Sequence, residues 1–286
     1  MHSEYAPLEA GTAASGLPDL AYTRHGRRDA PPLILLHGIG HRGRAWAPVV
    51  ETLAQDYDVI VPDLSGFGRS PAFAGGVPYD MENATAHLLG QFERWGVSKP
   101  HVAGNSLGGG IALELGARGL VASVTALSPA GFFGRLDRFQ ALGALMLLRI
   151  ATLVTPKAML RAMARNAAAR RAIGWLLYAH PERHDARTTY GDAIALKYAT
   201  AFERTAAAGV TYRFDSQVPV PTTIAWGTKD RILPYAQSAT ARRRLPSAEH
   251  VDLPGCGHVP MIDDPDLVAR VIDVTARRAH RREPAA

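Results

Sequence analysis

A serine lies in the centre of a glycine-rich stretch, where its hydroxyl is placed to act as a nucleophile. Residues 101–110 read HVAGNSLGGG, so Ser106 has Gly104 and Gly108 two residues away on either side. This G-x-S-x-G spacing is typical of a sharp strand-to-helix turn, which has no room for bulky neighbours. Such a turn exposes the serine oxygen and directs the backbone N–H of Leu107 toward negative charge formed nearby. The chemistry indicated is attack of an alcohol oxygen on a carbonyl carbon.

A serine hydroxyl is a weak nucleophile, so it needs a base to take its proton and a carboxylate to orient that base. We predict that His258, in the glycine-rich stretch LPGCGHVP, is the base. We predict that Asp230, in AWGTKDRILP, is the orienting acid. Each residue follows an expected strand, and the order serine, aspartate, histidine is the order in which elbow-type hydrolases carry these groups.

Two further aspartates compete for the acid role. Asp263 and Asp264 precede Pro265 and a segment with helical spacing. Aspartates in this position commonly accept hydrogen bonds from the free N–H groups at the start of a helix. We therefore expect both of them to be capping residues.

A negatively charged reaction intermediate needs a second backbone donor besides the N–H of Leu107. The turn that follows the apolar run LILL contains Gly38, Ile39 and Gly40, and its glycines allow close approach. We predict that the N–H of Ile39 completes an oxyanion hole with that of Leu107. His37, just before this turn, is expected to be a structural residue.

The elements that must position these residues alternate between strands and helices. Strands are expected at residues 20–24, 33–36, 57–61, 121–127, 222–226 and 250–253, together with the strand that leads into the serine turn. Strands that alternate with helices predict an α/β fold, a mainly parallel sheet with helices on both faces. Loops beyond the carboxyl ends of parallel strands converge, so Ser106, Asp230 and His258 can meet despite their separation in sequence.

The alternation stops between residues 132 and 212, where only helix-forming segments occur. We predict an α/β core formed by residues 1–131 and 213–286, and an all-helical cap formed by residues 132–212 over the catalytic end of the sheet. Apolar side chains of this cap are as consistent with ordinary core as with a substrate pocket: Leu142, Leu145, Met146, Leu148, Met159, Met163, Trp175, Leu176 and Tyr178.

Over roughly residues 20 to 278, the chain resembles an α/β-hydrolase of the capped serine-hydrolase type. The resemblance rests on residues 37–38, on Asp63 with residues 66–70, on residues 104–109, on residues 226–227 with Asp230, and on residues 257–258. It implies acyl-enzyme chemistry without a metal or an organic cofactor.

The resemblance leaves the substrate open among esters, thioesters, lactones, amides and carbon–carbon bonds. The pair Asn105-Ser106 is similar to that of ring-cleavage carbon–carbon hydrolases. Those enzymes have a stretch of small residues after the His-Gly pair, whereas this chain has HRGR at residues 41–44. We therefore favour a small-molecule ester with an apolar acyl or aromatic group, and keep the carbon–carbon hydrolase as an alternative.

A reading from a different class is a dinucleotide-binding oxidoreductase. The segment Gly38–Gly43 satisfies G-x-G-x-x-G after a strand, and Asp63 follows about twenty residues later, as in dinucleotide-binding folds. This reading leaves Ser106, Asp230 and His258 without a role. A binding module that has lost activity is a third reading, against which the intact set of catalytic residue types counts.

Composition indicates a globular chain. The 286 residues are 47% hydrophobic, enough for a large core. The net charge of +6 reflects 32 Lys+Arg against 26 Asp+Glu, with arginines concentrated in residues 161–187 and 277–282. These arginines are not interleaved with aromatic residues, so we interpret them as solvated helix faces and expect no nucleic-acid partner.

Three features bear on location. Residues 1–20 show no basic start followed by an apolar core, and the single cysteine, Cys256, permits no internal disulfide. The longest apolar run, residues 141–154, is interrupted by Arg149 and is shorter than the roughly 18 residues of a membrane span. We expect a cytoplasmic protein without a membrane span.

Overall fold

The computed structural model describes residues 17–134 and 137–280. Within them, seven strands form one sheet in the order β1-β3-β2-β4-β5-β6-β7. β1 is antiparallel to β3, and every other neighbouring pair is parallel, which confirms the predicted sheet. The strands are β1 Tyr22–His25, β2 Pro32–Leu36, β3 Asp58–Pro62, β4 His101–Asn105, β5 Ser123–Leu127, β6 Thr222–Gly227 and β7 Glu249–Leu253.

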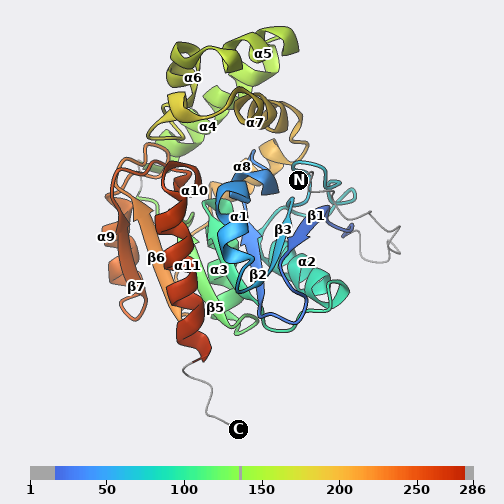
Figure 1. The fold of residues 1–286 in the computed structure, drawn as a ribbon, viewed down its shortest axis with the longest axis vertical. Helices are drawn as coiled ribbons and strands as arrows, with labels where there is room; N and C mark the ends of the chain where they lie inside the picture. The colour runs from blue at the N-terminus through green and yellow to red at the C-terminus, as the bar shows by residue number, and fades with distance from the viewer. Residues whose placement is uncertain (1–16, 135–136, 281–286) are drawn as a thin grey trace.

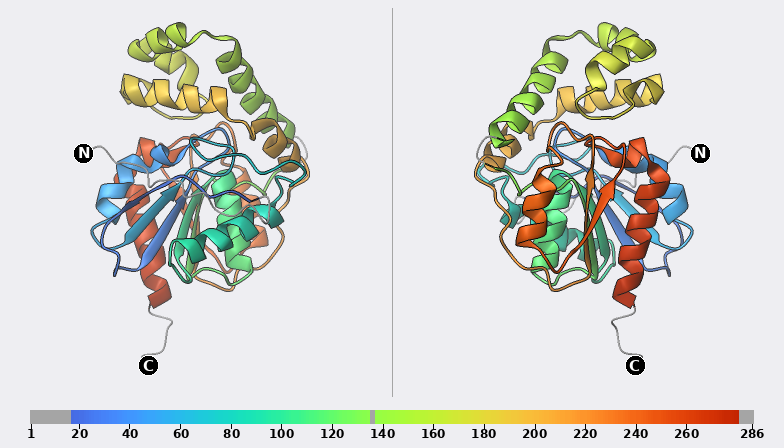
Figure 2. Two further views of the ribbon diagram at one scale, coloured as in Figure 1. Left: turned by 90° about the vertical axis from the view of Figure 1, so that its right-hand side faces the viewer. Right: turned by 90° about the vertical axis from the view of Figure 1, so that its left-hand side faces the viewer.

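Helices cover both faces of this sheet (Figure 1; Figure 2). One hydrophobic cluster joins α1 (Ala47–Leu53) and α11 (Pro265–His280) to the sheet. A second cluster on the opposite face involves α2 (Met81–Arg94), α3 (Leu107–Ala117) and α9 (Gln237–Arg244). Because the central strands are covered on both sides, β3, β4 and β5 are buried along their whole length.

Every element that the structure describes between β5 and β6 is helical. These elements are α4 Asp137–Val154, α5 Lys157–Arg165, α6 Ala167–Gly174, η2 Pro181–Arg183, α7 Ala186–Tyr198 and α8 Phe202–Gly209. We call them the helical insertion. In Figure 1 the insertion lies above the sheet, on the side where the loops after β2 and β7 contact it. The predicted division at residues 131–132 and 212–213 stays a prediction, and residues 1–16, 135–136 and 281–286 of those ranges lie outside the described residues.

The arginine that interrupts the apolar run of α4 joins the helices of the insertion. Arg149 is 7% exposed and donates hydrogen bonds to the carboxylate of Glu203, at 2.8 Å, and to the carbonyl of Ala199, at 3.1 Å. In the described chain, no single helix has the length and apolar composition of a membrane span. The bent pair of α4 and α5 meets that test only when the two are taken together, across a bend of 113°.

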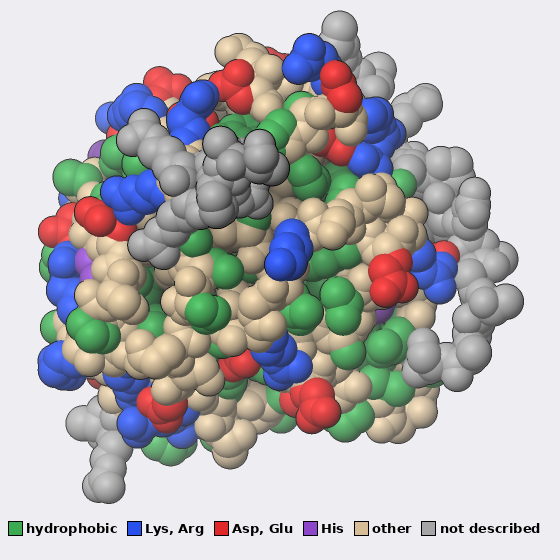
Figure 3. Space-filling view, turned by 90° about the horizontal axis from the view of Figure 1, so that it is seen from below, with side chains coloured by type: hydrophobic (Ala, Val, Ile, Leu, Met, Phe, Trp, Pro, Cys, Tyr) green, Lys and Arg blue, Asp and Glu red, His purple; other side chains and the backbone are tan. Residues whose placement is uncertain are grey.

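The face of the molecule opposite the insertion mixes charges of both signs (Figure 3). Arginines of α11 are paired with carboxylates: Arg277 lies 3.1 Å from Asp56 and 2.8 Å from Asp273, and Arg278 lies 3.3 Å from Glu249. These contacts agree with the interpretation of the arginines as a solvated helix face, and the absence of a nucleic-acid partner stays a prediction.

Candidate active site

Ser106 occupies the sharp turn that the glycine spacing predicts. It lies between β4 and α3 with a backbone φ of 56° and ψ of −115°, a conformation that side chains rarely adopt. A Cβ atom added at Gly104 would lie 2.1 Å from the carbonyl oxygen of Gly108, and one at Gly108 would lie 2.3 Å from that of Leu36. Both glycines are therefore required for the turn to form against β2.

The structure joins the predicted base and acid directly. Asp230 follows β6 and His258 follows β7, and the Nδ1 atom of His258 lies 2.8 Å from Oδ2 of Asp230. The other carboxylate oxygen, Oδ1, accepts hydrogen bonds from the backbone N–H groups of Ile232 and Leu233, both at 2.9 Å. A neutral imidazole that donates from Nδ1 carries its acceptor lone pair at Nε2. This geometry equips His258 to accept a proton at Nε2.

Asn105, the residue before Ser106, connects the histidine loop to the serine turn. Its side-chain amide donates to the backbone carbonyl of His258 at 2.8 Å and to that of Leu127 at 3.1 Å. In the sequence, Asn105 stands out only because the Asn105-Ser106 pair is similar to that of ring-cleavage carbon–carbon hydrolases. The sequence pattern does not predict its contact with His258. The structure thus places the backbone of His258 against the end of the strand that carries Ser106.

We expect replacement of Asn105 by alanine to reduce kcat by about 10- to 100-fold, with a smaller change in KM, because His258 loses a fixed position relative to Ser106. The measurement is steady-state ester hydrolysis alongside thermal unfolding. Ser123→Ala is the matched control, because it removes a buried 2.8 Å hydrogen bond to His101 at the other end of the same strands. Equal loss of kcat in the two variants would show that Asn105 acts only through stability.

The two predicted oxyanion donors belong to elements on either side of Ser106. Leu107 is the first residue of α3, and a Cβ atom on Gly38 would lie 3.1 Å from Cβ of Ser106. Gly40 has a φ of +72°, and a Cβ atom there would meet Leu196 of α7 at 2.6 Å. The turn containing Ile39 therefore fits closely between Ser106 and the insertion, and the oxyanion role of Ile39 and Leu107 stays a prediction.

His37 lies fully buried behind this turn. Its Nε2 atom accepts the backbone N–H of Leu64 at 2.8 Å, and its Nδ1 atom is paired with the carbonyl of Gly38 at 2.8 Å. Burial lowers the pKa of His37 to about 3, so the ring stays neutral at neutral pH. Both ring nitrogens of His37 are hydrogen-bonded to backbone groups. This is the structural role that the sequence predicts.

The low pKa of His37 predicts acid sensitivity of the fold. Below pH 6.5, His37 binds a proton in the unfolded chain, whereas in the folded chain it stays unprotonated down to about pH 3. The free energy of unfolding should therefore fall with decreasing pH by up to about 1.4 kcal/mol per pH unit for this group. Thermal unfolding from about pH 7 to about pH 5 measures this slope. His37→Asn, which has no titrating ring, should show a shallower slope, and an unchanged slope would contradict the assignment.

The carboxylate of Asp63 is hydrogen-bonded to backbone N–H groups of the protein itself. Its two carboxylate oxygens accept the N–H groups of Gly43, at 2.6 Å, and of Arg69, at 2.9 Å, and the residue is fully buried. A dinucleotide-binding site needs this acidic side chain to reach a ribose hydroxyl. The arrangement counts against the oxidoreductase reading of Gly38–Gly43, because the carboxylate instead joins the loops after β2 and β3.

The expectation for Asp263 is wrong. Asp264 caps α11 by accepting the N–H of Leu267 at 3.0 Å, as predicted. Asp263, one residue further from the helix, instead accepts the N–H groups of Ala179, at 3.0 Å, and of Gly257, at 2.7 Å. It thus ties the insertion to the loop of His258, a pairing between segments far apart in sequence.

Further contacts hold the insertion over the site. The backbone N–H of His258 donates to the carbonyl of Leu177 at 2.8 Å. On the turn after β2, Arg42 forms an ion pair with Asp192 of α7 at 3.2 Å. Tyr178 is buried, and its hydroxyl lies 3.4 Å from Nε2 of the neighbouring His41. Arg42 and His41, which follow the His-Gly pair, therefore position the insertion.

Comparisons with known proteins identify a family and several similar chains. The model of the alpha/beta hydrolase family matches residues 33–271. An uncharacterized protein of Mycobacterium tuberculosis is 29% identical, and lipase 1 of Psychrobacter immobilis is 27% identical; each alignment covers 92% of this chain and 81% of the relative.

Two solved structures show the same fold at low sequence identity. A putative lipase of Acinetobacter baumannii superposes with a TM-score of 0.77 at 20% identity, covering 98% of this chain and 93% of that one. The 2-hydroxy-6-oxo-6-phenylhexa-2,4-dienoate hydrolase of Rhodococcus superposes with a TM-score of 0.68 at 21% identity, covering 90% and 94%.

Proposed function

The chain belongs to the alpha/beta hydrolase family, and on this premise we propose that it is a serine hydrolase that cleaves carboxylic esters through an acyl-enzyme on Ser106. The observation that carries the proposal is the buried pair of Asp230 and His258, 2.8 Å apart and joined through Asn105 to the serine turn. A buried histidine–carboxylate pair beside a strained serine turn is the arrangement that activates a hydroxyl.

In the proposed reaction, Nε2 of His258 takes the proton of Ser106 while the serine oxygen attacks the ester carbonyl. The N–H groups of Ile39 and Leu107 stabilise the oxyanion, and His258 then gives the proton to the leaving alkoxide. A water molecule repeats the sequence on the acyl-enzyme and releases the acid. Asp230 holds the imidazole in the required tautomer throughout and stabilises its protonated form.

An ester is the substrate we favour over a carbon–carbon bond. The Asn105-Ser106 pair does not decide between them, because Asn105 holds the backbone of His258, a role useful to either reaction. The residues after the His-Gly pair hold the insertion through Arg42 and His41, where the resemblance implies small residues in carbon–carbon hydrolases. The lipase name of the Psychrobacter relative also supports an ester.

A panel of p-nitrophenyl esters of increasing acyl length, run beside Ser106→Ala, tests the proposal. Turnover that disappears in the variant supports a serine esterase. Turnover of a vinylogous diketone in place of every ester would support the carbon–carbon alternative. Binding of NAD without labelling of Ser106 by a fluorophosphonate would support the oxidoreductase. The small-molecule partner and the cytoplasmic location are part of this proposal.

A further inference from the structure

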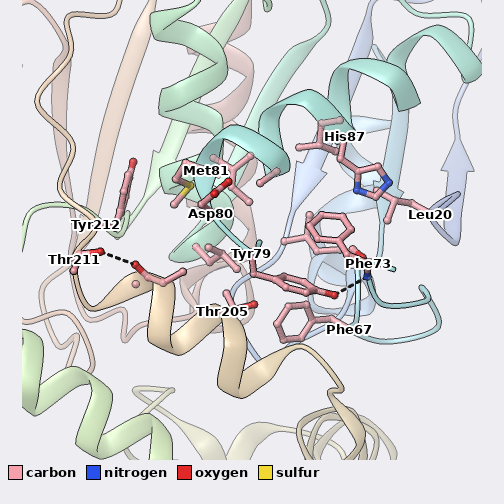
Figure 4. A pocket seen from close by; sticks show the side chains of 18 residues that line it. Leu20, Phe67, Phe73, Tyr79, Asp80, Met81, His87, Thr205, Thr211 and Tyr212 are labelled. Atoms are coloured by element: carbon pink, nitrogen blue, oxygen red, sulfur yellow. Dashed lines mark hydrogen bonds between the residues drawn. The ribbon is translucent and has the colours of Figure 1, made fainter. Parts of the chain in front are cut away.

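An apolar cavity of about 200 Å³ lies between α2 and α8 (Figure 4). The loop after β3, α2, the start of α3 and α8 form its walls, and none of the nine side chains suggested for a cap pocket lines it. The residues that line it are Leu20, Leu64, Ser65, Phe67, Phe73, Tyr79, Asp80, Met81, Ala84, His87, Leu88, Leu107, Ile111, Thr205, Ala208, Gly209, Thr211 and Tyr212.

Most polar groups of the lining are already paired. The hydroxyl of Tyr79 accepts the backbone N–H of Phe73 at 2.8 Å, and that of Ser65 donates to the carbonyl of Pro71 at 2.9 Å. The exception is the hydroxyl of Thr205, which has no hydrogen-bond partner among the described residues although the residue is only 6% exposed. The lining is therefore mainly apolar, and an occupant would contact hydrocarbon surface over most of the cavity.

The cavity adjoins the proposed oxyanion donor. Leu107 lines it and is also the residue directly after Ser106. Ser106 and His258 do not line the cavity, so an acyl chain attached to Ser106 would enter it past the side chain of Leu107. Asp80 and Thr211 also line the cavity and are exposed to solvent, so the cavity reaches the molecular surface at these two residues.

We propose that this cavity binds the acyl chain of the substrate and makes the enzyme selective for apolar acyl chains of medium length. The inference rests on the proposed ester hydrolysis. The volume exceeds that of an apolar cavity of about 150 Å³ that stays dry and binds benzene, so an alkyl chain fits by size and polarity. Removal of the chain from water supplies the binding energy in proportion to its length.

Two substitutions fill the cavity from opposite walls. Ala84→Phe projects from α2 and Ala208→Phe from α8, and both alanines line the cavity. Their matched controls are Ala86→Phe and Ala207→Phe, which add the same ring at exposed positions of the same helices. The wild-type enzyme should prefer p-nitrophenyl octanoate to acetate in kcat/KM. Each filling variant should lower that ratio at least about tenfold, because several methylene groups lose their apolar contacts, and the controls should keep it.

Binding is measured separately from catalysis. The Ser106→Ala protein should bind octanoate in a calorimetric titration, and Ala84→Phe in that background should weaken binding by a similar factor. If the wild-type protein bound octanoate but hydrolysed no ester, the proposed function would be overturned, whereas the assignment of the cavity as a site for an alkyl chain would stand. The acyl-chain assignment would be overturned if the octanoate-to-acetate ratio of kcat/KM were unchanged in both cavity-filling variants while they remained folded. It would also be overturned if the control variants lowered the ratio equally. In either case the proposed esterase activity would stand.

Discussion

Replacing Ser106 with alanine is expected to lower kcat for ester hydrolysis by about 10⁴- to 10⁶-fold, because the variant has no oxygen to form the acyl-enzyme. The residual rate would come from substrate binding and oxyanion stabilisation. Alanine removes one oxygen from a residue that is 6% exposed, so the melting temperature should change little. The backbone strain at a φ of 56° is retained in the variant, because alanine keeps the Cβ atom.

The measurement is burst and steady-state kinetics with a p-nitrophenyl ester, supported by fluorophosphonate labelling and intact-mass analysis. Ser238→Ala is a suitable control, since Ser238 is a buried serine on α9, away from the serine turn. Labelling should add one phosphonyl group to the wild-type and Ser238→Ala proteins and none to Ser106→Ala. Labelling or turnover that persists in Ser106→Ala would place the nucleophile elsewhere.

The second large effect is expected for Asp230→Asn, which should lower kcat by about 10³- to 10⁴-fold. The N–H groups of Ile232 and Leu233, each 2.9 Å from Oδ1, require an oxygen at that position. The amide oxygen of asparagine must therefore face them, and its NH₂ group must face Nδ1 of His258. A donor at this place forces the imidazole proton onto Nε2, so the ring cannot accept the proton of Ser106.

Asp264→Asn is the control for this prediction. Asp264 caps α11, and asparagine caps a helix about as well as aspartate, so kcat should stay within a few-fold of wild type. The comparison also separates the two acids that the sequence left in competition with Asp230. If Asp230→Asn retained most of its activity while an Asp263 or Asp264 variant lost it, the assignment of the orienting acid would be wrong.

Local sequence patterns were sufficient to predict the sheet, and they indicated the candidate residues of the site. The glycine spacing around Ser106 reflects a steric requirement of the turn itself, since a Cβ at Gly104 would come within 2.1 Å of the Gly108 carbonyl. The strand ends that carry Asp230 and His258 follow from continuous apolar runs, whose meaning depends on a few neighbouring residues. The parallel order of strands then brings these ends to one edge.

Contacts between distant segments were not available from such patterns. Asp263 was expected to cap the next helix, yet it accepts the N–H of Ala179 across 84 positions of the chain. The contact of Asn105 with His258 spans 153 positions. The partner of a polar side chain depends on where the folded backbone places it. Residue type and spacing in the sequence do not specify that position.

The amino-acid sequence by itself determined which groups were present for chemistry, the sharp turn at Ser106, and the alternation of strands and helices that predicts a mainly parallel sheet, because these depend on local sterics and periodicity. Only the tertiary structure decided which polar atoms meet, how Asp263 and Arg42 hold the insertion over the site, and where a cavity remains beside Leu107. The cavity is the space that packing leaves unfilled between α2, α3, α8 and the loop after β3, so it depends on these segments together and on none of them alone.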